Sequence, residues 1–224
     1  MSDLPDFDHA VTRLTRIDPD FAGIIKLAGP PLFVARPQGF RTLLHIILGQ
    51  QISVAAAASM EAKLDARCRP LTAGRFLKLS DADLKECGFS RQKMAYARHL
   101  AEAITARRFD PKTLRAQADE AVLAELIKLK GIGRWSAEIY LLFALERSDI
   151  WPADDLALQL GVQYLKGLDA RPSAANLRAI AEPWRPWRTA AACLIWHFYR
   201  HRLTLSRAAS APPKPVPDRS RSGR

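Results

Sequence analysis

Apolar residues recur at helical spacing along almost the whole chain. In the segment 90–107, for example, Met94, Ala97, Leu100 and Ile104 lie three or four positions apart and share one face of a helix. No stretch alternates apolar and polar positions as a half-buried strand does, and the chain has no Asn-Gly or Asp-Gly hairpin turn. The pattern therefore predicts an all-α protein.

Short polar signals mark where several of these helices begin. Asp18 followed by Pro19 is a typical helix start, and Ser80 with Asp83 three residues later resembles a capping box. With the apolar spacing, they predict one helix that starts at Asp18 and others over 40–50, 52–64, 80–88, 90–107, 118–128, 134–145, 154–166 and 186–203.

The C-terminal segment 206–224 has a different composition. It is rich in proline, serine and arginine and carries few apolar residues, so it cannot bury enough surface to fold alone. We expect a disordered basic tail. Such a tail can add nonspecific affinity for DNA, or it can simply be a solvated end of the chain.

Length and charge narrow the class of protein. The 224 residues suit one large domain or two small lobes around a shared core. A formal net charge of +11 favours a polyanionic partner such as nucleic acid, although a solvated basic surface is the alternative.

The three cysteines and the N-terminus bear on location and metal content. Cys68, Cys87 and Cys193 are odd in number and widely spaced, which argues against a disulfide framework, a zinc site and an iron–sulfur cluster. No signal peptide and no run of 18 apolar residues is visible. We expect a soluble intracellular monomer without a membrane span, cytoplasmic and associated with the nucleoid if the source is bacterial.

A glycine turn between two predicted helices is the central motif of the chain. Residues 126–137 read Leu-Ile-Lys-Leu-Lys-Gly-Ile-Gly-Arg-Trp-Ser-Ala, in which Gly131 and Gly133 flank Ile132. Glycines expose backbone N–H groups, and the following helix adds its free N-terminal N–H groups and its dipole, so the turn can hold a phosphate. Ile132 would plug the turn into the core. The alternative is a plain corner between two helices.

Two adjacent carboxylates, Asp154 and Asp155, open the helix predicted downstream of this turn. Aspartate is a favoured N-cap, so one of the pair needs no further explanation. The second is a candidate for chemistry, because a carboxylate at a helix N-terminus can stabilise positive charge that develops on a sugar.

Four segments, taken in order, resemble the glycosylase branch of the helix-hairpin-helix superfamily, and most closely the 3-methyladenine-DNA glycosylase II group. They are Gly-Ile-Gly-Arg-Trp at 131–135, Pro-Ala-Asp-Asp at 152–155, Ile-Leu-Gly-Gln-Gln-Ile-Ser at 47–53 and the tryptophan-rich segment 184–196. The resemblance covers residues 36–203. It implies a two-lobed helical fold with an active-site cleft between the lobes, a glycosylase domain over 36–205 and an N-terminal helical segment over 1–35 that packs on it.

The resemblance also implies roles for individual residues. Asp155 matches the catalytic aspartate, and Asp154 would serve as its cap and support. The base pocket would be lined by Trp135, Trp196 and Tyr140. DNA would be contacted by Gln51, Gly131, Gly133, Arg134 and Ser136, with Gln51 entering the gap left by the flipped nucleotide. A monovalent cation, Na⁺ or K⁺, would be held in the DNA complex by the backbone carbonyls of Ile127, Leu129 and Ile132.

Departures from the family pattern refine the expected reaction. Bifunctional members carry a lysine where this chain has Trp135, and tryptophan cannot form an imine. His197 and Ile139 stand where some relatives carry tyrosines, and the cysteines that hold an iron–sulfur cluster in others are absent. We therefore expect a monofunctional enzyme without a cofactor.

The expected substrate is double-stranded DNA with alkylated purines, 3-methyladenine and 7-methylguanine, whose N-glycosidic bond is hydrolysed after base flipping. Asp155 would stabilise the oxocarbenium-like sugar, position a water molecule, or do both. The alternatives are a glycosylase of other lesion specificity and a non-catalytic helix-hairpin-helix DNA-binding module.

Overall fold

The computed structural model describes residues 7–209, and this part of the chain is helical without a strand. The all-α prediction is confirmed. The α-helices are α1 (Phe7–Ile17), α2 (Pro19–Ala28), α3 (Phe40–Gly49), α4 (Val54–Arg67), α5 (Ala73–Phe76), α6 (Asp81–Glu86), α7 (Arg91–Thr105), α8 (Asp119–Ile127), α9 (Arg134–Phe143), α10 (Leu156–Lys166), α11 (Ala174–Ala181) and α12 (Arg188–Ala209). The 3₁₀-helices are η1 (Pro111–Ala116) and η2 (Glu182–Trp184).

The capping signals lie where the sequence predicted them. Asp18 is the N-cap of α2 and accepts a hydrogen bond from the Asp20 N–H, with Pro19 as the first helical residue. Ser80 and Asp83 form a complete capping box at the start of α6. The capping residues therefore locate the first residue of these helices, which the apolar spacing alone predicts only to within a residue or two.

The C-terminal helix is longer than predicted. α12 continues to Ala209, so the tail boundary placed at residue 206 is wrong by four residues. The helix carries long and apolar side chains as far as Leu205, and these favour helix beyond the predicted end at residue 203. Residues 210–224, which hold the rest of the predicted tail, lie outside the described residues. None of the helices within residues 7–209 is long and apolar enough to cross a membrane.

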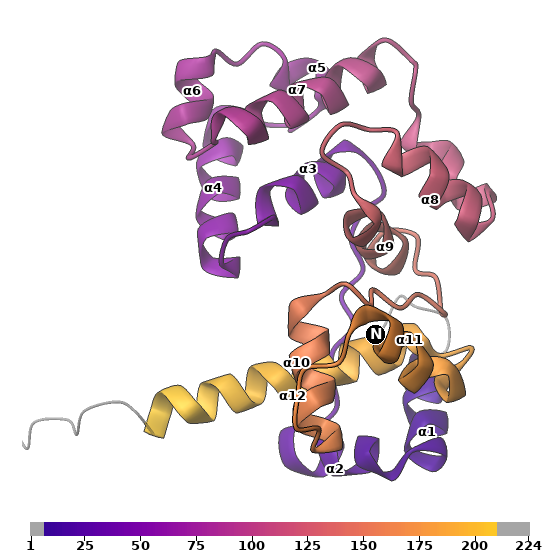
Figure 1. The fold of residues 1–224 in the computed structure, drawn as a ribbon. Helices are drawn as coiled ribbons and strands as arrows, with labels where there is room; N and C mark the ends of the chain where they lie inside the picture. The colour runs from indigo at the N-terminus through magenta and orange to yellow at the C-terminus, as the bar shows by residue number, and fades with distance from the viewer. Residues whose placement is uncertain (1–6, 210–224) are drawn as a thin grey trace, which may run out of the picture.

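The helices form two lobes joined around α9 (Figure 1). One lobe contains α3 to α8, and the other contains α1, α2, α10, α11 and α12. In the second lobe, α10 and α12 approach closely at Gly161, where a β-carbon would lie 2.5 Å from Cγ2 of Ile195. This close approach matters because α10 and α12 each contribute residues to the site described below.

The N-terminal helices are attached to the second lobe through Asp18. The carboxylate of Asp18 accepts hydrogen bonds from Nζ of Lys166 at 2.6 Å and from the indole N–H of Trp184 at 3.0 Å. Lys166 ends α10, and Trp184 precedes α12. The cap of α2 therefore also holds α2 against the elements that carry the site.

Candidate active site

The carboxylate of Asp155 lies at the N-terminus of α10 and accepts three hydrogen bonds. Its Oδ1 accepts from the backbone N–H of Leu158 at 2.7 Å and from the indole N–H of Trp196 at 2.9 Å. Its Oδ2 accepts from the indole N–H of Trp135 at 2.9 Å. The donors come from α10, α12 and α9, so three helices fix the orientation of one carboxylate.

The N-cap role predicted for Asp154 belongs to Asp155. Asp155, and not Asp154, is the N-cap of α10. Asp154 is exposed and pairs with Arg178 of α11 at 3.4 Å. The prediction that Asp154 caps the helix is wrong, because α10 begins one residue later than predicted. Asp155 is therefore both the N-cap of α10 and the carboxylate that the two indole N–H groups hold.

Trp196 stands at the end of a row of stacked aromatic rings. Phe33 stacks on Phe143 at 5.9 Å, and Phe143 stacks on Trp196 at 6.0 Å with the ring planes 18° apart. Phe143 therefore covers one face of Trp196, and the indole edge points at Asp155. Trp135 and Trp196 are both partly exposed beside the carboxylate, and their predicted role as walls of a base pocket remains a prediction.

Tyr140 does not line the predicted base pocket. Its side chain is fully buried, and its hydroxyl accepts the backbone N–H of Gly39 at 2.9 Å, which holds the start of α3 against α9. Burial raises the pKa of Tyr140 to about 12. The structure contradicts the predicted pocket role, because α9 turns this residue away from Trp135 and into the core. The side chain of His197 also has a backbone partner, because its Nε2 lies 2.8 Å from the Ala28 carbonyl oxygen.

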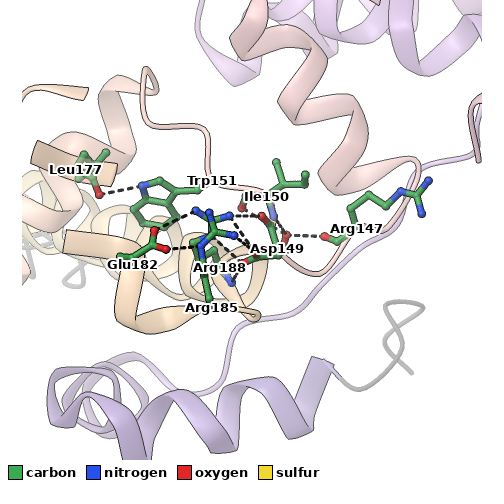
Figure 2. A network of polar contacts seen from close by, with 9 residues as sticks. Arg147, Asp149, Ile150, Trp151, Leu177, Glu182, Arg185 and Arg188 are labelled. Atoms are coloured by element: carbon green, nitrogen blue, oxygen red, sulfur yellow. Dashed lines mark hydrogen bonds and ion pairs between the residues drawn. The ribbon is translucent and has the colours of Figure 1, made fainter. Parts of the chain in front are cut away.

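The loop that leads to Asp155 is anchored by an ion-pair network around Asp149 (Figure 2). The Asp149 carboxylate accepts from Nε and Nη2 of Arg188 at 2.7 and 2.9 Å, and from Nη1 of Arg185 at 2.7 Å. Two residues on, the indole N–H of Trp151 donates to the Leu177 carbonyl at 3.1 Å. Arg185 and Arg188, which lie at and just before the start of α12, therefore hold this loop in place.

Asp149→Asn should lower the free energy of unfolding by about 1–3 kcal/mol. A fully buried ion pair broken on one side costs roughly 3–5 kcal/mol, and the partial exposure of Asp149 and Arg185 reduces that value. The measurement is a thermal melt beside Asp169→Asn, which removes the same charge from an exposed position. Equal melting temperatures for the two variants would show that the network does not anchor the loop.

The glycine turn lies between α8 and α9, as predicted. Its two glycines differ in backbone conformation and in the space around them. Gly131 has a φ of +87°, and a β-carbon there would lie 2.2 Å from the ring of Tyr96. Gly133 has a φ of −90° and open space where a β-carbon would be. Gly133 is the N-cap of α9 without a side-chain cap, so the first N–H groups of that helix face outward for an anion. Ile132 is buried, as predicted.

Gln50, which the sequence analysis did not predict as a site residue, links the end of α3 to the glycine turn and to α9. Gln50 donates from its amide to the Gly131 carbonyl at 2.8 Å and to the Ser136 hydroxyl at 3.0 Å. The side chain of Ser136 therefore faces the interior, and the predicted contact of its backbone N–H with DNA remains a prediction. The neighbouring Gln51 is exposed with a φ of +58°, so the turn after α3 presents its side chain to solvent.

Arg134, the first residue of α9, is half-exposed and forms an ion pair with Glu138 at 2.9 Å. Burial raises the pKa of Glu138, and the nearby Arg134 opposes that rise. The guanidinium of Arg134 is thus held beside the uncapped N-terminus of α9, where a phosphate would benefit from both.

The predicted cation carbonyls run from Ile127, the last residue of α8, to Ile132 in the glycine turn. The Leu129 carbonyl accepts the Ile132 N–H at 3.0 Å, which leaves it one further lone pair for a cation. No cluster of three or more His, Cys, Asp or Glu side chains suited to a metal occurs within residues 7–209. The predicted binding of Na⁺ or K⁺ by these carbonyls remains a prediction.

An uncapped glycine hairpin beside a tightly held aspartate defines a helix-hairpin-helix protein with a candidate catalytic carboxylate. The family described as HhH-GPD superfamily base excision DNA repair protein matches residues 44–186, well over half of the chain. The chain belongs to this superfamily.

Known relatives share the family and the fold. The chain is 30% identical over 203 residues to the alkylbase DNA glycosidase-like protein mag2 of Schizosaccharomyces pombe, covering 88% of this chain and 95% of that protein. It is 29% identical over 170 residues to DNA-3-methyladenine glycosylase 2 of Escherichia coli, covering 70% and 57%. The solved structure of Schizosaccharomyces pombe 3-methyladenine DNA glycosylase Mag1 with abasic DNA has a TM-score of 0.78 at 27% identity, over 84% of this chain and 95% of that one.

Proposed function

We propose that this protein is a monofunctional DNA glycosylase that hydrolyses the N-glycosidic bond of alkylated purines, 3-methyladenine and 7-methylguanine, in double-stranded DNA. The observation that carries the proposal is the Asp155 carboxylate, which two indoles and a helix N-terminus hold in one orientation. The names of the relatives support the substrate class.

The mechanism follows from this geometry and the chemistry of the lesion. The target nucleotide leaves the base stack, because its glycosidic bond is inaccessible within a duplex. An alkylated purine is cationic, and the free face of a tryptophan attracts it by about 0.5–2 kcal/mol. As the bond to the base breaks, positive charge develops on the sugar, and Asp155 stabilises that charge without having to reorient.

The hairpin holds the DNA without reading its sequence. The N–H groups at the start of α9 and the Arg134 guanidinium bind a backbone phosphate, and phosphate contacts position a protein on the duplex without selecting bases. In the DNA complex, the carbonyls of Ile127, Leu129 and Ile132 would hold Na⁺ or K⁺. The protein acts as a monomer.

The reaction should leave an intact abasic strand and no covalent adduct. A lyase needs an amine that attacks the sugar, and the position that carries it in bifunctional relatives is Trp135. Borohydride added during turnover should therefore trap no enzyme–DNA adduct on denaturing gels. An adduct that persists at neutral pH would contradict the monofunctional proposal.

Trp196→Phe should slow base release by roughly 5- to 20-fold, because the ring stays stacked on Phe143 while one hydrogen bond to the carboxylate is lost. The measurement is the single-turnover rate across a range of pH, together with affinity for an abasic-site duplex. A packing role alone would lower the melting temperature and leave the shape of the pH profile unchanged. Trp187→Phe, a tryptophan contacted by His9 and Arg13 away from Asp155, is the matched control.

Lesion competition tests the specificity directly. Duplexes that carry methylated purines, uracil, 8-oxoguanine or thymine glycol are incubated with the enzyme, and the freed bases are separated by chromatography. We expect release from methylated DNA alone. Release from an oxidised or deaminated duplex alone would favour another specificity, and binding without any release would favour a non-catalytic DNA-binding module.

A further inference from the structure

The last turns of α12 extend beyond the other helices of the second lobe (Figure 1). All side chains from 202 to 206 are exposed, and Leu203 and Leu205 are 39% and 53% exposed. Residues 200–202 read Arg-His-Arg, and the sequence from 183 to 217 contains no Asp or Glu. The end of α12 is therefore a basic surface on which no acidic side chain of its own segment competes for a partner.

One of the two arginines, Arg202, is held against α10. Its guanidinium carbon lies 4.4 Å from the ring centre of Tyr164, and that ring stacks on Tyr199. Tyr199 in turn packs on α10, because a β-carbon at Gly161 would lie 3.6 Å from its Cβ. Arg202 therefore belongs to the face of α12 that contacts α10, and its charge interacts with an aromatic ring of the same lobe.

The other arginine, Arg200, points in a different direction. Trp196, Arg200 and Leu203 are four and three residues apart, so they share one face of the helix. This Trp196 face begins at the candidate active site, since the Trp196 indole N–H donates to Asp155 at 2.9 Å. Arg200 follows about 6 Å further along the helix axis. Its side chain is exposed, and its guanidinium has no hydrogen-bond or ion-pair partner within residues 7–206.

We propose that Arg200 binds the DNA phosphate next to the flipped nucleotide, which makes the Trp196 face of α12 a DNA-contact surface separate from the hairpin. The proposal rests on the proposed function, in which the sugar of the target nucleotide lies at Asp155. That sugar is joined to a phosphate on either side, and a long side chain one turn beyond Trp196 is placed to reach one of them. A guanidinium matches a phosphate with parallel, charge-assisted hydrogen bonds.

An abasic duplex tests this contact in the full-length protein by affinity alone. The probes are an undamaged duplex and the same duplex with one tetrahydrofuran abasic analogue, which fills the site without a base to release. Arg200→Gln should bind the abasic duplex about 5- to 10-fold more weakly, and the slope of log affinity against log salt should decrease by about 1. Its affinity for the undamaged duplex should change less than about 2-fold, because no sugar then lies at Asp155.

Methylphosphonates locate the contact on the DNA. Each of the two phosphates that flank the abasic analogue is replaced in turn by this uncharged group. One replacement should weaken wild-type binding about 5- to 10-fold and Arg200→Gln binding less than about 2-fold, since both changes remove the same interaction. Arg202→Gln is the matched control, because it removes the same charge two residues further on from a side chain held on α10. It should bind the abasic duplex as the wild type does.

Equal affinity of Arg200→Gln and the wild type for the abasic duplex would overturn the proposal. So would equal weakening of the abasic and undamaged duplexes, which identifies a general attraction to DNA, or a methylphosphonate effect that persists in the variant. Glutamine is a good helix former and Arg200 has no partner to lose, so the melting temperature should not change. If the expected differences appear but the wild type releases no base, the contact is retained and only the proposed function fails.

Discussion

Asp155→Asn should lose base release by at least about 100-fold while it still binds abasic duplexes. Asparagine is as good an N-cap as aspartate, so α10 and the fold should persist. The charge is lost, and the amide NH₂ must face one of the two indole N–H donors in place of an acceptor. The measurement is the single-turnover rate of base release, with binding to an abasic duplex as the second readout.

Asp154→Asn is the matched control for this variant. It removes the neighbouring charge from an exposed residue whose partner is Arg178, and it should change the rate less than about 3-fold. If Asp154→Asn proves the more damaging change, the carboxylate held by the two indoles is not the one that acts on the sugar.

Gly131→Ala should lower the free energy of unfolding by about 2–5 kcal/mol. A β-carbon would impose a left-handed backbone cost of roughly 1–2 kcal/mol and would overlap the Tyr96 ring, which adds about 1–3 kcal/mol. The melting temperature should fall by roughly 2–4 °C per kcal/mol for a chain of this size. In a Tyr96→Ala background, the same change should cost only the backbone part, since the overlapping ring is gone.

Gly133, in the same turn, should tolerate a side chain that Gly131 does not. Gly133→Ala should cost no more than about 1 kcal/mol, because the space is open and φ is negative. Gly133→Asp should fold well, since aspartate is a favoured N-cap, yet lose DNA binding because its charge faces the phosphate. Normal binding of Gly133→Asp to damaged and undamaged duplexes would show that the turn is only a helix corner.

The helical framework could be predicted from the sequence because helices depend on local information. Apolar spacing and the caps at Asp18 and Ser80 place most helices within a few residues. The helices α1, α5 and α11 are not among those that the spacing and caps predict. With four and eight residues, α5 and α11 carry too few periodic positions to stand out. The buried Ile132 also followed from its place between two glycines.

The contacts that position the site could not be predicted, because they join residues far apart in the chain. Nothing local to Gly131 indicates the ring of Tyr96, and nothing local to Asp149 indicates two arginines more than thirty residues downstream. The indole N–H groups of Trp135 and Trp196 meet at Asp155 only once three helices are packed. The role of Tyr140 depends on its contact with Gly39, 101 residues earlier in the chain, which no local pattern indicates.

The most direct test of the account is the product that the wild-type enzyme forms from methylated duplex DNA under single-turnover conditions. Free 3-methyladenine, identified by chromatography, should accumulate well above the spontaneous rate, with one abasic site for each base released. The same incubation with Asp155→Asn at equal DNA occupancy should yield only the spontaneous amount. If the wild-type protein binds this DNA but releases no modified base, Asp155 is a helix cap alone and the protein is not the glycosylase proposed here.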